Sequence, residues 1–264
     1  MPQLIDRPQL KQEVRTLLSG ASINPKKLTV LYLMLVLVLN MVDTLAPNLI
    51  HISAVTTFIS ILTSLMANVL LVGFTLTCMT LCQRQQAVYS NLFDGFSFVG
   101  KIICLEIITY FFIYLWSLLF LIPGIVAAYR YRFALYNLCE NPSISVFEAL
   151  NQSKWQSRGY KQQLFLLDLS YLGWMLLASL PMLVEYAVSA PQILQTYSAL
   201  LTNAPVPDFT LPLLPGWGWL LVAGLWEAVV SAFFLPERTC MEYEYFLTAK
   251  ETRTPSKNPP DFPM

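Results

Sequence analysis

Five ionisable residues interrupt stretches of the chain that are otherwise apolar, and they are the residues best placed to do chemistry. They are Glu106, Arg130, Arg132, Asp168 and Glu227. Charged side chains inside a membrane are costly, so they are retained for one of two reasons. They line a path for a proton or a substrate, or they pair with one another and fix the packing of helices. Two cations nearly balance three anions, which favours pairing.

The helical positions of these residues predict specific pairs. Arg130 and Arg132 are two residues apart, so they lie on nearly opposite sides of a helix and need different partners. At a rise of about 1.5 Å per residue, Arg132 and Glu227 lie at matching depths from the cytoplasmic ends of their helices. We therefore predict that Arg132 pairs with Glu227, and that Arg130 reaches Glu106 or Asp168.

No sequence motif of a catalytic or cofactor site accompanies these charges. The patterns G-x-S-x-G and H-E-x-x-H and the phosphate-binding glycine loops are absent. His51 is the only histidine, which leaves little for a Ser-His-Asp triad or a histidine metal site. Cys78 and Cys82 share a helix face without further ligands nearby, so we interpret them as small packing residues. We expect no cofactor, no metal and no enzymatic activity.

The composition identifies the solvent in which the chain folds. Hydrophobic residues make up 56% of the 264 residues and charged residues only 12%, whereas soluble domains contain roughly 25% charged residues. A soluble protein of this size could not bury so much apolar surface in one core. The predicted partner of this surface is therefore a lipid bilayer. The net charge of zero does not indicate nucleic-acid binding.

Hydropathy predicts five membrane-spanning helices, and the distribution of charge adds a sixth. Crossing a hydrocarbon core of about 30 Å takes about 20 residues. Five segments meet this length: 28–46, 55–82, 101–122, 164–184 and 213–235. Segment 123–139 is also apolar but carries Arg130 and Arg132. Because Lys and Arg near span ends favour the cytoplasm, only a crossing at 123–139 places the basic connection around Lys154 inside and the Lys- and Arg-free segment 185–212 outside. We predict an all-α bundle of six spans with both termini in the cytoplasm.

Two short segments outside the spans predict helices that lie at the membrane surface. Residues 1–27 form a cytoplasmic segment with an apolar stripe and several basic residues, typical of an amphipathic helix on an anionic leaflet. Ser145 and Glu148 form a capping box that begins a second short helix, and Gly159 is suited to close it.

The remaining segments predict irregular structure. Residues 191–215 are rich in proline and contain no basic residue, which indicates an exposed outer loop. The membrane domain is expected to extend over residues 28–236. A cytoplasmic tail follows at 237–264, and its proline-rich end predicts disorder from about residue 255.

The central part of the chain resembles a known family. Residues 118–132 read LLFLIPGIVAAYRYR; Glu140-Asn141-Pro142, Glu148-Ala149-Leu150 and Gly159-x-Lys161 follow, and residues 165–174 read FLLDLSYLGW. A weaker similarity to the same family is the sequence NLFDGF at residues 91–96. These motifs resemble a bacterial membrane family called domain of unknown function 975. The resemblance implies a six-helix inner-membrane protein with an arginine-bearing fourth span, and it makes segment 185–212 an enlarged outer connection. It implies no activity.

Two functions are open on this evidence. The first is a non-enzymatic scaffold or accessory subunit that assembles with another membrane protein or a transporter complex, which short connections and a self-neutralising charge set favour. The alternative is a transporter or lipid-handling protein that uses the charge cluster of the inner leaflet, although the two halves show no internal repeat. In that case an unmatched carboxylate would be the functional group. Asp168 has a further possible partner in Lys161, seven residues earlier on its helical face.

Overall fold

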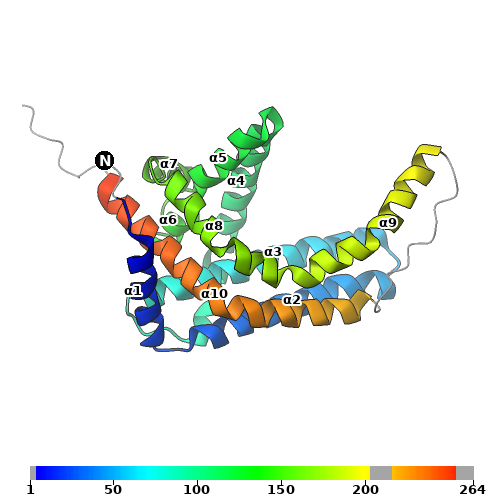
Figure 1. Ribbon diagram of the computed structural model, residues 1–264, viewed down its shortest axis with the longest axis horizontal. Helices are drawn as coiled ribbons and strands as arrows, with labels where there is room; N and C mark the ends of the chain where they lie inside the picture. Colours follow the sequence, from blue (N-terminus) through cyan, green and yellow to red (C-terminus); the bar gives the residue numbers. More distant parts are fainter. Residues whose placement is uncertain (1–3, 203–215, 254–264) are drawn as a thin grey trace, which may run out of the picture. The chain divides into compact units, whose positions relative to one another are not determined.

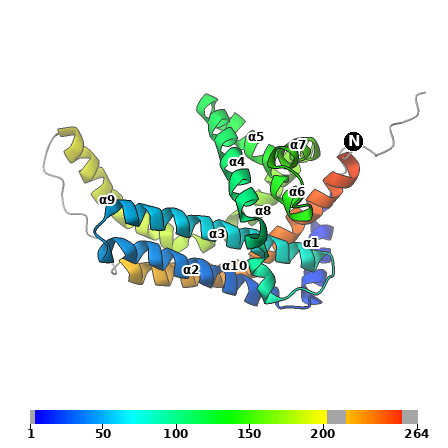
Figure 2. The ribbon, with the colours of Figure 1, turned by 180° about the vertical axis from the view of Figure 1, so that it is seen from behind.

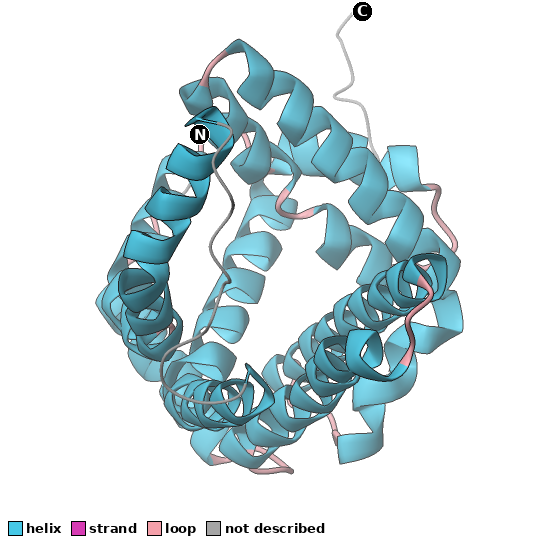
Figure 3. Ribbon diagram, turned by 90° about the vertical axis from the view of Figure 1, so that its right-hand side faces the viewer, coloured by secondary structure: helices cyan, strands magenta, loops and turns pink. Residues whose placement is uncertain are grey.

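The computed structural model describes residues 4–202 and 216–253, and the regular structure in these two stretches is entirely helical (Figure 3). This confirms the all-α class. The helices in chain order are α1 (Arg7–Ser19), α2 (Pro25–Leu49), α3 (Ser53–Cys82), the 3-10 helix η1 (Tyr89–Phe98), α4 (Val99–Leu119), α5 (Leu121–Tyr131), α6 (Ala134–Glu140), α7 (Val146–Gln156), α8 (Lys161–Ala178), α9 (Leu180–Thr202) and α10 (Gly216–Arg253).

Four helical stretches of the described residues are long and apolar enough to cross a membrane. They are Pro25–Leu49, Ser53–Cys82, Tyr89–Leu119 and Trp217–Thr252. Helices α8 and α9 form a bent pair that adds a fifth crossing if the pair is counted as one span. Such helices are typical of a multi-pass membrane protein. This count does not confirm the six predicted crossings.

The crossing missing from this count is the predicted span 123–139, which is divided between α5 and α6. The helix breaks at Arg132 and Phe133 because a side chain of α7 takes over backbone hydrogen bonds there. Ser153 donates its hydroxyl to the carbonyl of Arg130 at 2.9 Å and accepts the peptide N–H of Phe133 at 3.1 Å. An inserted side chain of this kind is a recognised cause of helix kinks.

The chain divides into two compact units, each of which is described by itself. Unit 1 comprises Met1–Pro25, Val69–Tyr171 and Pro236–Met264. Within it, α4 and α5 form a hairpin that packs on α6 and α7 (Figures 1 and 2). The buried core of these four helices consists of Leu105, Ala127, Tyr131, Ala134, Leu138, Val146, Ala149 and Leu150.

Two glycines allow the 3-10 helix η1 to lie directly against the second half of α3 in unit 1. A Cβ atom on Gly73 would lie 1.8 Å from the carbonyl oxygen of Leu92, and one on Gly95 would lie 2.7 Å from the carbonyl oxygen of Val69. Real Cβ contacts are never this short, so the two backbones touch where no side chain fits. This contact accounts for the glycine in the NLFDGF motif.

Unit 2 comprises Lys26–Asn68 and Leu172–Leu235. Helix α2 lies beside the first half of α10, because Gly224 leaves room for Leu37: a Cβ on this glycine would lie 2.4 Å from the leucine Cδ1 (Figures 1 and 2). The indole N–H of Trp226 donates to the carbonyl of Leu177 at 2.8 Å. Asp43 of α2 accepts a hydrogen bond from Ser60 of α3.

Helix continues through two places where the sequence predicted that it ends. The last predicted span stopped at residue 235, but α10 runs through Pro236 to Arg253. Cys240, Tyr243 and Phe246 are fully buried beyond the proline, and their packing offsets the backbone hydrogen bond that proline removes. Similarly, α9 continues through Pro191 to Thr202, within the predicted outer loop. The rest of that loop, and the tail predicted to be disordered from residue 255, lie outside the described residues.

The local signals for α7 are confirmed. The hydroxyl of Ser145 accepts the peptide N–H of Glu148 at 3.2 Å and caps the helix that begins at Val146. Gly159 adopts a left-handed backbone conformation, with φ of 87°, in the turn between α7 and α8. This turn brings the first residue of α8 next to the end of α7.

Candidate functional site

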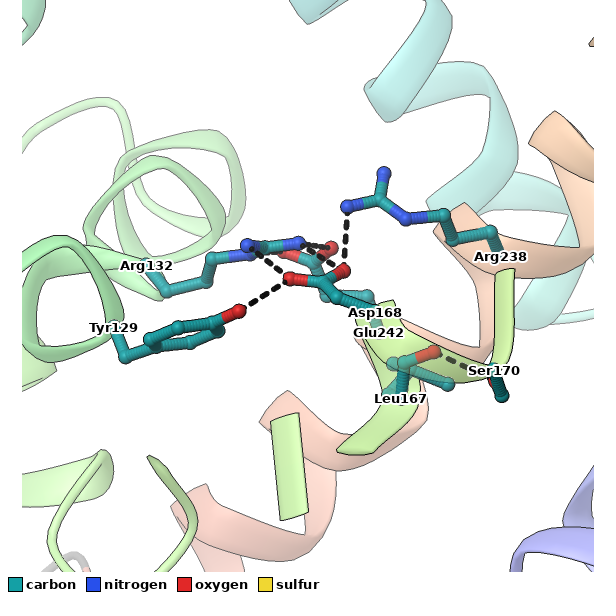
Figure 4. A network of polar contacts seen from close by, with 7 residues as sticks. All are labelled: Tyr129, Arg132, Leu167, Asp168, Ser170, Arg238 and Glu242. Atoms are coloured by element: carbon teal, nitrogen blue, oxygen red, sulfur yellow. Dashed lines mark hydrogen bonds and ion pairs between the residues drawn. The ribbon is translucent and has the colours of Figure 1, made fainter. Parts of the chain in front are cut away.

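The most concentrated group of charges in the described residues lies in unit 1, where α5, α8 and α10 meet. The break between α5 and α6 points Arg132 at these helices, and α8 contributes Asp168. Helix α10 contributes Arg238 and Glu242, which are four residues apart and therefore on one helical face. Figure 4 shows these four side chains together with Tyr129 of α5. We call the five residues the charge network.

Arg132 lies at the centre of the charge network and binds two carboxylates at once. Its Nε and Nη2 atoms donate to Oε1 and Oε2 of Glu242 at 2.8 and 2.7 Å. Its Nη1 and Nη2 atoms donate to Oδ2 and Oδ1 of Asp168 at 2.9 and 3.1 Å (Figure 4). Paired contacts of this kind combine two charge-assisted hydrogen bonds with a fixed geometry. Arg132 therefore joins α8 to α10 from one side chain.

Asp168 is satisfied on both of its oxygens. Besides the contacts of Arg132, Oδ1 accepts Nη2 of Arg238 at 2.7 Å and Oδ2 accepts the hydroxyl of Tyr129 at 2.9 Å. The side chains of Asp168, Arg132 and Arg238 are 19%, 23% and 19% exposed, and that of Glu242 only 9%. Two arginines thus neutralise two carboxylates in a partly buried site, which is the arrangement that such charges require.

Aromatic side chains hold α6 against α10 beside the charge network. The rings of Tyr136 and Phe246 stack with their centroids 5.5 Å apart, and Tyr243 lies 5.9 Å from each of them. Phe133 packs on Phe246 from the start of α6 at 5.7 Å. These contacts fix the backbone that carries Arg132.

The structure brings together two of the five charged residues that the sequence singled out, namely Arg132 and Asp168. The predicted partner of Arg132 was Glu227, but its place is taken by Asp168 and by Glu242. The prediction chose Glu227 because it treated Pro236 as the end of the last span. Glu242 lies about four helical turns beyond Glu227 on the same helix. Its signal was the aromatic sequence around it, MEYEYF, which is too apolar for a solvated tail.

The other predicted residues lie elsewhere. Glu106 is half-buried on α4, and Glu227 is exposed on α10. Arg130 directs its guanidinium to the ring of Tyr131, 5.9 Å from the centroid. The sequence analysis predicted that Arg130 reaches Glu106 or Asp168, but within the described residues no hydrogen bond or ion pair joins Arg130 to either carboxylate. The five residues therefore do not form one cluster.

A second group of charges attaches α1 to α8 and α10 within unit 1. Glu237, with a side chain 9% exposed, accepts Nζ of Lys11 at 3.1 Å and Nε of Arg15 at 2.7 Å. Its Oε1 also accepts the hydroxyl of Tyr171 at 2.6 Å. The hydrogen bond that Arg15 donates to the carboxylate of Glu237 raises the pKa of Arg15 above its usual value. Basic residues that the sequence assigned to lipid headgroups are thus bonded to the protein itself.

Replacing Glu237 by glutamine is expected to release α1. The amide keeps the size of the side chain but loses the charge that holds Lys11 and Arg15. In protein with a tagged N-terminus, we expect trypsin to cleave after these two residues several-fold faster than in the wild type. The control is Glu13→Gln, since Glu13 accepts only from Gln9 on its own helix. Equal cleavage rates in the two variants would contradict this attachment.

The described residues contain no group of three or more His, Cys, Asp or Glu side chains that is placed to hold a metal ion. The cysteines within them are free thiols. Cys78 is buried, and its carbonyl lies 3.8 Å from the sulfur of Cys240. The interpretation of Cys78 as a packing residue agrees with this burial.

Comparison with known proteins bears directly on the central motif. The family model described as "Protein of unknown function (DUF975)" matches residues 118–253, just over half of the chain. The chain belongs to this family. The DUF975 match contains the whole charge network, together with α5 to α10. The resemblance inferred from the sequence is therefore confirmed. No curated protein and no solved structure matches the chain significantly, and DUF975 membership carries no activity with it.

Proposed function

We propose that this chain is a non-enzymatic membrane protein that serves as a scaffold or accessory subunit for another membrane protein. The charge network supports a structural role for its members, because each carboxylate in it is already bound by arginine. A transport site needs groups that are free to bind and release a substrate. The alternative of a transporter or lipid-handling protein built on these charges therefore has less support.

The observation that carries the proposal is the exposure of Glu227. This carboxylate lies in an apolar part of α10 and makes no hydrogen bond or ion pair within the described residues. A charged residue at the centre of a membrane helix costs about 2.5–3.5 kcal/mol on insertion scales. Such residues normally face the interior of a bundle. An exposed Glu227 is best explained by a partner protein that supplies a donor to it inside the membrane.

The proposed topology has six crossings, with both termini in the cytoplasm of a bacterial cell and the protein in its inner membrane. The crossings are α2, α3, α4, α5 with α6, α8 with α9, and α10. Residues 121–140 of α5 and α6 are long enough to cross a core of about 30 Å. The break between them is tolerable in a membrane because Ser153 satisfies the freed backbone groups. Helices α1 and α7 lie at the inner surface in this arrangement.

Substituting Glu227 tests the assembly function. We expect Glu227→Leu to insert and elute as a folded protein at least as well as the wild type, because the substitution removes a desolvated charge. The same variant should retain at least ten-fold less of any membrane protein that co-purifies with a tagged wild-type chain from mild detergent. Quantitative mass spectrometry of the purified material measures this ratio.

The matched control is Val229→Ala, at an exposed apolar position two residues along the same helix. It should retain the wild-type partners. If Glu227→Leu keeps the same partners in the same amounts, the assembly function is wrong. If the retained partner is a second copy of this chain, the scaffold is a homo-oligomer and the substitution should convert it to monomers.

A further inference from the structure

Four basic side chains of unit 1, from α5, α7, α8 and the turn between α7 and α8, converge at the junction of these helices. They are Arg130, Lys154, Arg158 and Lys161. The positive charges of Arg130 and Arg158 both act on Lys161. The guanidinium of Arg130 and the ammonium of Lys154 each lie 5.9 Å from the ring centroid of Tyr131. We call these four residues the basic cluster.

The backbone beneath the basic cluster is fixed. The carbonyl of Arg130 accepts hydroxyl hydrogen bonds from Ser153 at 2.9 Å and from Ser157 at 3.2 Å. Both serines are fully buried. The last turn of α5 is therefore tied to the last turn of α7, and the left-handed Gly159 turns the chain directly into Lys161. The fold of the backbone therefore holds the four charges together.

No carboxylate of the described residues forms an ion pair with any member of the basic cluster. Lys11, Arg15, Arg132, Arg238 and Lys250 each pair with a carboxylate, and none of them belongs to the cluster. Lys154 donates only to the amide oxygen of Asn151 at 3.0 Å. Four like charges brought this close repel one another unless an anion lies among them. The part of the chain that the structure describes thus supplies no carboxylate to the cluster.

Large apolar side chains stand exposed beside the basic cluster on α7. Phe147 and Trp155 are 62% and 60% exposed. Arg158 follows in the turn after α7, and its guanidinium lies 4.0 Å from the centroid of the Trp155 ring. Aromatic rings next to basic groups are typical of side chains at the boundary between headgroups and acyl chains. An occupant that matches this surface has an anionic head and an apolar body.

We propose that the basic cluster is a binding site for the phosphate headgroup of an anionic phospholipid, with Phe147 and Trp155 against its acyl chains. Arginine and lysine supply the donors that a phosphodiester accepts. This site does not include Glu227 and shares no residue with the charge network. If the basic-cluster variants lose lipid binding, the proposed assembly function is not affected. If Glu227→Leu loses its partners, the proposed lipid site is not affected.

Native mass spectrometry of the detergent-purified full chain tests the site. The chain is titrated with phosphatidylglycerol or with phosphatidylcholine of the same acyl chains. We expect the anionic lipid to bind at least ten-fold more tightly. In the double variant Lys154→Gln with Arg158→Gln this preference should fall at least ten-fold, while the charge-conserving Lys154→Arg with Arg158→Lys should keep it. Size-exclusion elution identical to the wild type verifies the fold.

The control is Lys27→Gln with Arg84→Gln, which removes two exposed positive charges that are not members of the basic cluster. It should change the preference less than two-fold. An equal loss in this control would mean general electrostatic attraction and would overturn the site, as would equal affinities for the two lipids. Inorganic phosphate at millimolar concentration should not displace the lipid. Full displacement would mark the cluster as a site for free phosphate and would also overturn the proposal.

Discussion

Replacing Arg132 by methionine is expected to destabilise the folded protein by about 3–5 kcal/mol, the cost of leaving buried charge unpaired. Asp168 keeps Arg238 as a partner, but Glu242 loses both of its guanidinium hydrogen bonds. Because Glu242 is only 9% exposed, water cannot replace them. We expect the midpoint of thermal aggregation, followed by fluorescence-detected size-exclusion chromatography, to fall sharply or the variant to accumulate only as aggregate.

The charge network also predicts a rescue. Adding Glu242→Leu to Arg132→Met removes one cation and one anion, and it leaves Arg238 paired with Asp168. The double variant should therefore be more stable than Arg132→Met alone, since an apolar pair often replaces a buried ion pair without loss. The control is Arg130→Met, two residues earlier and without a carboxylate partner in the described residues. A thermal midpoint for Arg132→Met equal to that of Arg130→Met would refute the structural role.

Replacing Gly73 by alanine is expected to cost about 3 kcal/mol of stability, although alanine normally stabilises a helix interior by roughly 1 kcal/mol over glycine. The sign reverses because the new Cβ atom would lie 1.8 Å from the carbonyl oxygen of Leu92. That oxygen belongs to the backbone, so no flexible side chain can move away. Helix α3 and η1 must separate to make room.

The control for this reversal is Gly173→Ala, in the interior of α8. A Cβ atom at Gly173 has no neighbour within 4 Å, so this substitution should leave the thermal midpoint unchanged or raise it. The two variants have the same change in composition and in helix propensity. A similar midpoint for both would mean that α3 and η1 do not touch at Gly73.

Features that depend on neighbouring residues in the chain could be predicted from the sequence. The helix cap at Ser145 and the apolar helices follow from side-chain type and local spacing alone. The break at Arg132 could not be predicted in this way. It depends on the hydroxyl of Ser153, which lies on α7 twenty residues after Phe133 and bonds to the backbone at the break. The spacing of residues within 123–139 does not predict such a contact.

The candidate site was predictable in type but not in membership. Charge balance correctly indicated that Arg132 would be neutralised within the protein, because an unpaired buried charge is too costly. The identity of the partner depended on where α10 ends. A proline is normally a strong signal for a helix end, and its outcome here was decided by the burial of Tyr243 and Phe246 beyond it. Comparing the depths of Arg132 and Glu227 along their helices takes no account of such long-range packing.

The separation of Arg132 and Glu242 along the chain imposes an order on biosynthesis. Glu242 is 110 residues downstream, and Asp168 is 36 residues downstream. At roughly 5–20 residues per second, Glu242 is synthesised about 5–20 seconds after Arg132. During that interval Asp168 is the first counter-charge of the network to leave the ribosome. Helix α8 therefore provides the first anionic partner for the arginine, and the network is completed only after α10 has been synthesised.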